Sequence, residues 1–174
     1  MLRALLIRDG ATPAWGEGEA AVTLPQAGER LWVDAVSPTP EELQLLRDRF
    51  DLHPVAIDSC LRVDTRPKIE EYREQLFIVL HKLVVPEAPA ESLTSLELHV
   101  FLGDGYLVTI QDDPLPEVAG VAARMVAEAS LRERSLVYAY YLVCERLTHV
   151  NFDALDALFE GVEKIEDSVL QGVD

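Results

Sequence analysis

The pattern of hydrophobic and polar positions divides the first part of the chain into short segments with the length and period of strands. Alternating or nearly continuous apolar residues predict strands at Leu2–Ile7, Leu31–Val36, Leu76–Val85, Leu96–Leu102 and Tyr106–Ile110. The almost wholly apolar run Leu76–Val85 is typical of a central strand covered on both faces. Gly103-Asp104-Gly105, between the last two segments, indicates a tight hairpin.

Two further segments have a weaker pattern. Lys68–Tyr72 is predicted to be a strand with Ile69 facing the core. Asp9–Glu29 is rich in Gly, Pro and Ala and has no steady period, so we expect a loop or an irregular hairpin there.

Apolar residues spaced by three or four positions predict the helices. Thr39-Pro40-Glu41-Glu42 can form a capping box, which starts a helix that runs to about Phe50. A second helix is expected from His53-Pro54 to about Leu61, with Val55, Ala56, Ile57 and Cys60 on its apolar face and Asp58 and Ser59 toward the other side. A third helix follows Asp113–Pro116, which we expect to cap it.

From Ser135 onward the pattern is helical to the end of the chain. A helix of this length spans roughly 55 Å, which exceeds the diameter of a small domain, so its far half needs another helix beside it. Residues 151–174 contain seven acidic residues and one basic residue, Lys164. We therefore divide the chain into an α/β domain, residues 1–134, and a long acidic helix, residues 135–174.

Composition narrows the classes of function. The 174 residues are 49% hydrophobic, enough for one α/β domain with a substantial core. The formal net charge of −16 argues against nucleic acid as a partner and favours attraction of cations. No stretch approaches the ~18 apolar residues that a membrane-spanning helix needs.

The candidate chemistry is carried by carboxylates. The histidines and cysteines lack the spacing of a zinc site, and no glycine-rich phosphate loop is present. Glu97 and His99 share one strand face and are expected to form a solvated pair. Because Mg²⁺ keeps several waters and uses one or two protein carboxylates, isolated acids such as Asp58 or Glu145 are compatible with a weak outer-sphere site. The alternative for each single acid is a solvated surface role.

Several motifs resemble the cytosolic domain of CorA-type magnesium transporters. The most specific are Phe50-Asp51-Leu52-His53-Pro54 and Arg66-Pro67-Lys68-Ile69-Glu70. Leu31-Trp32-Val33-Asp34, the run Val108–Pro114 and Tyr138-Ala139-Tyr140-Tyr141 also look like segments of that family. The resemblance extends over roughly Leu31–Leu170, which is most of the chain.

The resemblance implies an α/β/α sandwich with a mixed central sheet, followed by a long C-terminal helix. It further implies a homopentamer at the cytoplasmic face of the cell membrane that senses Mg²⁺ for a pore. The family's stalk helix, its two membrane helices and its Gly-Met-Asn motif have no counterpart in this sequence, so the chain looks like a water-soluble fragment of such a transporter.

The resemblance also implies metal ligands. The family's adjacent acidic pair falls on Asp58 and Ser59, of which the first alone is acidic, and a further acid falls on Glu145. The family's third carboxylate belongs to the missing stalk helix. The transported cation stays open, since zinc- and cobalt-handling relatives share the domain.

Two alternatives come from other classes of function. A metal-dependent hydrolase would use Asp112, Asp113 and Glu97 as ligands and would need a pocket on which they converge. A non-catalytic scaffold would bind a partner through the long helix.

Overall fold

The computed structural model describes residues 1–62, 65–85 and 93–171. In these residues seven strands form one sheet: β1 (Leu2–Ile7), β2 (Trp15–Glu17), β3 (Arg30–Val36), β4 (Lys68–Tyr72), β5 (Gln75–Val84), β6 (Thr94–Gly103) and β7 (Tyr106–Gln111). The helices are α1 (Pro40–Phe50), α2 (Pro54–Cys60), α3 (Pro116–Ala127), α4 (Ala129–Arg132) and α5 (Leu136–Gln171), with a short 3₁₀ turn, η1, at Glu19–Ala21.

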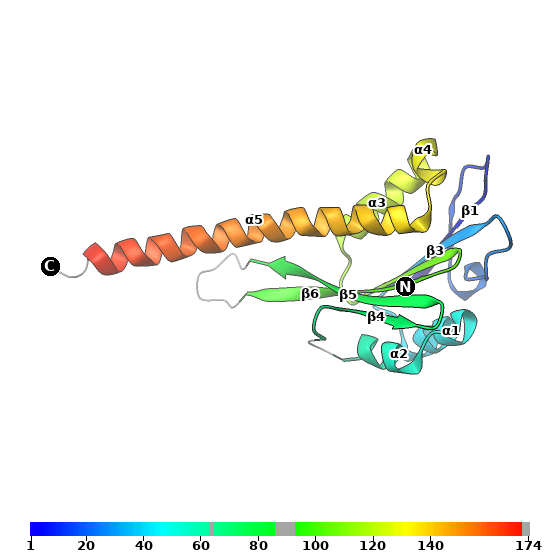
Figure 1. Cartoon of the computed structure of the whole chain (residues 1–174), viewed down its shortest axis with the longest axis horizontal. Coiled ribbons are helices and arrows are strands. Elements are labelled where there is room, and N and C mark those ends of the chain that lie inside the picture. The colour runs from blue at the N-terminus through cyan, green and yellow to red at the C-terminus, as the bar shows by residue number, and fades with distance from the viewer. Residues whose placement is uncertain (63–64, 86–92, 172–174) are drawn as a thin grey trace.

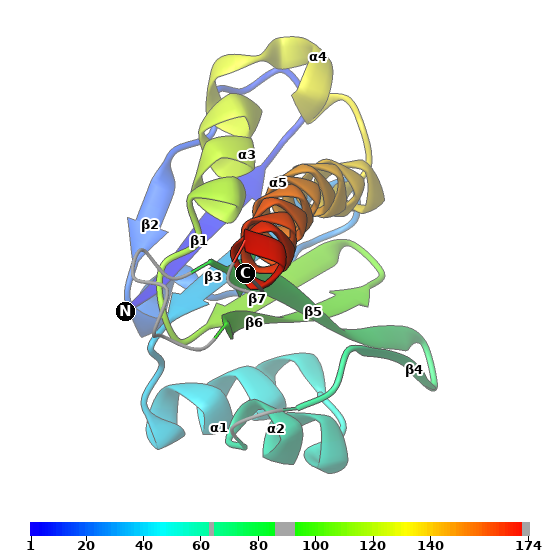
Figure 2. The same ribbon diagram turned by 90° about the vertical axis from the view of Figure 1, so that its left-hand side faces the viewer.

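The sheet is mixed and is covered on both faces. Its strand order is β2-β1-β3-β7-β6-β5-β4, and β3 and β7 run parallel whereas the other neighbouring strands are antiparallel. Figure 2 shows α1 and α2 on one face and α3 and α5 on the other. Each face has its own cluster of buried apolar residues. The predicted α/β/α sandwich with a mixed sheet is therefore confirmed.

Local sequence signals account for the starts of the helices. At α1 the hydroxyl of Thr39 accepts a hydrogen bond from the Glu42 N–H, and the Glu42 carboxylate accepts one from the Thr39 N–H, which is the predicted capping box. The helix ends at Asp51, whose φ of 48° lies in the left-handed region. The N-cap of α3 is Leu115, which lies within the stretch Asp113–Pro116 that was expected to cap the helix, but it makes no side-chain cap bond.

The long helix α5 leaves the sheet about halfway along its length. Its inner face is buried from Leu136 to Ala154, and none of the described side chains beyond Ala154 is buried. At 1.5 Å per residue its 36 residues span about 54 Å. In Figure 1 the second half of α5 extends past the sheet, as its length predicts. The last three residues of the predicted helix, 172–174, lie outside the described residues.

Several predicted positions differ in the structure. Ile69 is 69% exposed, because the register of β4 places Lys68, Glu70 and Tyr72 on the inner face instead. Val55 is 54% exposed, and Ser59 is buried although it was expected on the polar side of α2. β5 lies next to the edge strand β4, and its fully buried part is confined to residues 77–79. The irregular stretch after β1 contains β2, which pairs with β1 as an irregular hairpin.

A buried carboxylate joins three neighbouring strands. Asp34 on β3 is completely buried and accepts hydrogen bonds from Arg3 Nη2, Thr109 Oγ1 and Gln111 Nε2, each at 2.7 Å. Trp32 Nε1 donates to the same Thr109 hydroxyl at 3.0 Å. Because a buried charge is costly unless it is paired and hydrogen-bonded, this network holds β1, β3 and β7 in one register.

Glu97 and His99 are not the solvated pair that was expected. His99 is buried, and its Nε2 lies 3.2 Å from Glu97 Oε2, although neither atom forms a hydrogen bond. The other Glu97 oxygen accepts from the Thr65 N–H at 2.8 Å. Burial, with smaller effects of His81 and Lys68, lowers the pKa of His99 to about 4. The poorly aligned Glu97 carboxylate does not offset this cost of charging a buried ring.

We expect the Asp34→Ala variant to lose stability. The change leaves Arg3 and two buried polar side chains without their acceptor, and Arg3 is partly exposed, so the loss should be about 3 kcal/mol, at the lower end for a broken buried pair. Urea denaturation followed by circular dichroism measures it. Asp153→Ala removes an exposed carboxylate from α5 and serves as the control. Equal losses in the two variants would contradict the assigned role of the network.

His99 predicts a pH dependence of stability. The folded-state pKa lies below the ordinary value of 6.5, so the unfolded chain binds the extra proton. Stability is therefore complete above pH 6.5 and falls between pH 6.5 and about 4, by roughly 1.4 kcal/mol per pH unit. Denaturation curves at several pH values should show a smaller slope for His99→Gln than for the wild-type chain. His149→Gln, at an exposed histidine on α5, should keep the wild-type slope.

Candidate divalent-cation site

Asp58 presents the first candidate ligand from the outer side of α2. The helix begins after His53, whose ring stacks on Tyr72 at 4.2 Å between centroids and makes no side-chain cap bond. The Asp58 side chain is exposed, one residue before the buried Ser59. A carboxylate in this position can reach a hydrated cation or another chain.

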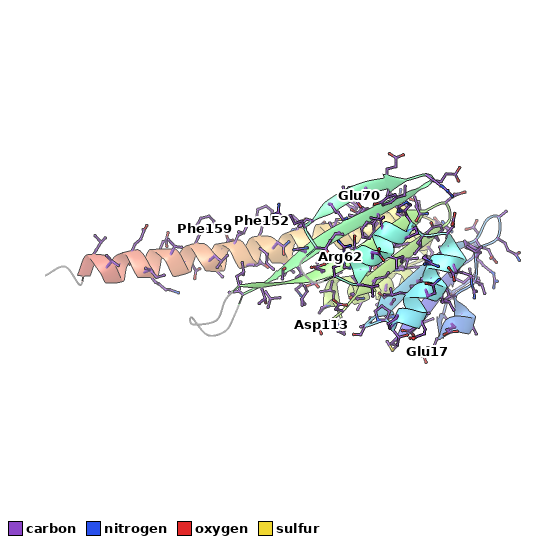
Figure 3. All side chains as sticks on the ribbon, turned by 90° about the horizontal axis from the view of Figure 1, so that it is seen from below. Glu17, Arg62, Glu70, Asp113, Phe152 and Phe159 are labelled. Carbon is purple, nitrogen blue, oxygen red and sulfur yellow. The ribbon has the colours of Figure 1, made fainter. Side chains whose placement is uncertain are left out.

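Ser59 is turned into the protein and held there. Its hydroxyl donates to Val55 O at 3.1 Å and accepts from Lys68 Nζ at 3.3 Å. Lys68 also pairs with Glu70 at 2.9 Å, and both residues belong to β4 (Figure 3). Hydrogen bonds from Tyr72, and then from Lys68, lower the pKa of Glu70. Lys68, which ends the Arg66-Pro67-Lys68 turn, therefore hydrogen-bonds Ser59 inside the protein. Of the adjacent pair, only Asp58 faces outward.

Glu145, the second candidate ligand, lies on α5 in the opposite layer. Its side chain is exposed and lines a groove of about 380 Å³ with Glu117, Arg146 and His149. Glu117 is itself buried, and its Oε1 pairs with Lys82 Nζ at 2.8 Å. The sheet separates this groove from α2, so Asp58 and Glu145 of one chain do not face a common point (Figure 2).

The described residues contain no ready-made metal cluster. In residues 1–62, 65–85 and 93–171 no three histidine, cysteine, aspartate or glutamate side chains are gathered so as to hold an ion. A site that used both Asp58 and Glu145 would need two chains. That arrangement agrees with the separation of these residues into different layers.

The hydrolase ligands do not converge. Glu97 is committed to the Thr65 N–H, whereas Asp112 and Asp113 are exposed at the end of β7. Figure 3 shows Asp113 at the surface beside the sheet. A cleft of about 910 Å³ lies at the other end of β6 and β7, but two of the acids that line it, Glu29 and Asp9, are paired with Arg8 and Arg30. Neither arrangement offers the converging acids that metal-dependent hydrolysis requires.

A second face of α5 went unrecognised in the sequence. Positions spaced alternately by three and four residues form a continuous exposed row, which we call the α5 seam. Its members are Tyr138, Tyr141, Glu145, Thr148, Phe152, Leu155, Phe159, Val162, Glu166 and Val169. Phe159, labelled in Figure 3, lies on the part of α5 beyond the sheet, and Phe152 lies close to the point where the helix leaves the sheet. A 3.5-residue repeat of this kind is the pattern of a helix that winds around another helix.

Glu145 is a member of this seam, so the candidate ligand stands where a neighbouring helix would pack. The alternating three- and four-residue spacing was the signal that could have identified the seam from the sequence. Among the described residues, no helix is both long and apolar enough to cross a membrane.

Comparisons with known proteins agree with this geometry. The family model described as "CorA-like Mg2+ transporter protein" matches residues 28–174. The chain is 30% identical over 137 residues to YfjQ, a candidate metal ion transporter of Bacillus subtilis, with 79% of this chain and 41% of YfjQ covered. It is 24% identical over 147 residues to the cobalt/magnesium transport protein CorA of Methanocaldococcus jannaschii, with coverage of 83% and 45%. The chain thus spans less than half the length of these relatives.

Solved structures give the same result for the fold. The soluble domain of CorA from Methanocaldococcus jannaschii superposes with a TM-score of 0.70 at 18% identity, covering 100% of this chain and 66% of that chain. Full-length CmaX superposes with a TM-score of 0.65 at 24% identity, covering 98% and 51%. The fold of this chain therefore matches the soluble domain of CorA and part of CmaX, and the family match covers most of the sequence. The chain therefore belongs to the family of CorA-like Mg²⁺ transporter proteins.

Proposed function

We propose that this chain is the ion-sensing domain of a CorA-like transporter of Mg²⁺ or another divalent cation. The observation that carries the proposal is the placement of two exposed carboxylates, Asp58 and Glu145, on opposite layers of one sandwich. In a ring of identical chains, the α2 side of one copy meets the α5 side of the next. A hydrated cation held between two copies would then have carboxylates from both.

The charge of the chain supports an ion-dependent assembly. At a net charge of −16, copies repel one another unless cations screen or bridge them. Mg²⁺ suits a weak site of one or two carboxylates because it retains most of its waters. Bound ions would favour the closely packed assembly and their loss would loosen it, which is a population shift driven by differential ion affinity.

The full-length assembly would be a homopentamer at the cytoplasmic face of the membrane. Its pore would lie in the part of the relatives that is outside their match with this chain. The α5 seam supports this arrangement, since it offers a neighbouring helix a packing surface along its whole length. Its acidic members Glu145 and Glu166 would face that helix. In this reading the domain senses the ion and catalyses no reaction.

The seam also favours a second candidate function, a scaffold that binds a partner helix without an ion. The two candidates differ in their dependence on divalent cations. Association that is unaffected by Mg²⁺ but is abolished by Phe152→Ser with Phe159→Ser would identify the scaffold.

We expect Mg²⁺ to promote association of the chain. Sedimentation velocity with about 10 mM MgCl₂, compared with NaCl at equal ionic strength, should show larger species, and the melting temperature should rise because the ion binds the native state. Asp58→Asn with Glu145→Gln should remove both effects. The matched control, Asp48→Asn with Asp153→Asn, makes the same charge change at exposed positions of α1 and α5 and should keep them.

Two results would contradict the proposal. The first is a wild-type chain that responds identically to MgCl₂ and NaCl. The second is a control variant that loses the Mg²⁺ response as completely as the Asp58 and Glu145 variant does, because the response would then reflect total charge alone.

A further inference from the structure

The end of β5 extends past its neighbour at the edge of the sheet. β4 pairs with residues 75–79 of β5, whereas β6 pairs with residues 76–84 on the other side. From residue 80 onward, β5 therefore has backbone groups that point away from β6 and that pair with none of the described strands. A buried backbone group without a partner costs about 1–3 kcal/mol, and residues 80–84 are half-buried, so a hydrogen-bonding partner at this edge stabilises the fold.

Asn151 on α5 supplies that partner. Its Oδ1 accepts a hydrogen bond from the Leu83 N–H at 2.8 Å, and its Nδ2 donates to the His81 carbonyl at 2.9 Å. Residues two apart on one strand edge present such a donor and acceptor side by side. A primary amide carries both an acceptor and donors, so the side chain of Asn151 binds the edge as another strand would. Asn151 is the chain's one asparagine.

The contact lies where α5 departs from the domain. Ala154, less than one turn later, is the last buried residue among those described on α5. Sliding or turning of the helix would leave both the Leu83 N–H and the His81 carbonyl unpaired. The two bonds therefore define one position of α5 on the sheet rather than a continuous range.

The same short piece of β5 is bound from two other directions. Lys82 pairs with the largely buried Glu117 of α3 at 2.8 Å. On the opposite face of the sheet, His81 Nε2 lies 2.6 Å from the carbonyl oxygen of Thr65. Thr65 directly precedes the Arg66-Pro67-Lys68 turn. His81 thus contacts the turn through its side chain and α5 through its backbone. It forms a direct connection across the sheet.

We propose that Asn151 is a positioning residue, a latch that fixes α5 on the end of β5 and couples the helix to the Thr65–Lys68 turn through His81. With the latch closed, the turn and the helix are held in one arrangement. With it open, the exposed half of α5 gains freedom and the turn loses part of its support. The latch depends on no bound ion, so it is independent of the proposed sensing function.

Amide hydrogen exchange tests the latch. In Asn151→Ala, we expect exchange at the Leu83 N–H to rise at least about tenfold, as for loss of one local hydrogen bond. Exchange at the Thr65 N–H should rise with it. The core amides of Val100 and Ile110 should keep their rates. Asn151→Asp retains the acceptor for Leu83 but not the donor to His81, so Leu83 should stay more protected than in Asn151→Ala.

A distance measurement tests the position of α5. Spin labels at Asp48→Cys on α1 and Glu163→Cys on α5, in a Cys144→Ser background, report the distance between the far half of α5 and the helix layer on the other face of the sheet. Cys60 is left in place because it is buried and burial raises the pKa of its thiol, which makes it unreactive. The wild-type distance distribution should be narrow, and Asn151→Ala should broaden or shift it.

The control is Thr148→Ala, one turn earlier on α5, which loses a hydrogen bond to Cys144 O within the helix and none to the sheet. It should keep the wild-type distance distribution and the protection of Leu83. Unchanged distances and exchange in Asn151→Ala would overturn the latch, as would an equal rise in exchange at Val100 and Ile110. A rise at Leu83 without a rise at Thr65 would overturn the coupling to the turn.

Discussion

The buried carboxylate of Asp34 is the contact on which the arrangement of this domain depends. Asp34 belongs to β3, and its carboxylate accepts hydrogen bonds from side chains of β1 and β7. It therefore fixes the parallel strand pair at the centre of the sheet. Gln111 donates to this carboxylate, and its own carbonyl accepts from the N–H of Leu115 at the start of α3, 2.7 Å away. The network therefore positions both the sheet and a helix that covers it.

The parallel pair also explains the two-sided architecture. Because β3 and β7 are parallel, their C-terminal ends lie side by side, and each strand is followed within a few residues by a helix. One of these helices, α1, passes to one face and the other, α3, to the opposite face (Figure 2). The sheet consequently becomes a partition between Asp58 and Glu145. Any site that combines them must be built between molecules, and any signal from one face to the other must pass through the sheet, as it can at His81.

The sequence allowed most of the fold to be predicted, because the strongest signals are local. The capping box at Thr39, the hairpin at Asp104 and the start of α5 depend on neighbouring residues and were confirmed. The errors arose where distant residues decide. Ile69 faces outward because Lys68 and Glu70 have polar partners on the inner face. Successive side chains of a strand alternate between its two faces, so an error of one position exchanges the inner and outer residues. His99 is buried because residues on other strands and the turn cover it.

The candidate site was predictable only in part. Asp58 and Glu145 could be nominated from motifs, but their separation by the sheet depends on the topology, which no local pattern encodes. The internal role of Ser59 depends on Lys68, nine positions later, reaching back beneath α2. Asn151 could not be recognised either, since its partners are backbone groups and carry no side-chain signature. The α5 seam, by contrast, was present in the spacing of the sequence.

The inward charges of β4 have a consequence for how the protein behaves at high concentration. An edge strand ordinarily invites strands from other molecules to extend the sheet, and many such additions lead to insoluble deposits. Here Lys68 and Glu70 stand on the inner face of a five-residue edge strand, bonded to one another. An added strand would have to place its own side chains against this ion pair. The β4 edge of the sheet is thus protected against uncontrolled growth, while the α5 seam stays exposed.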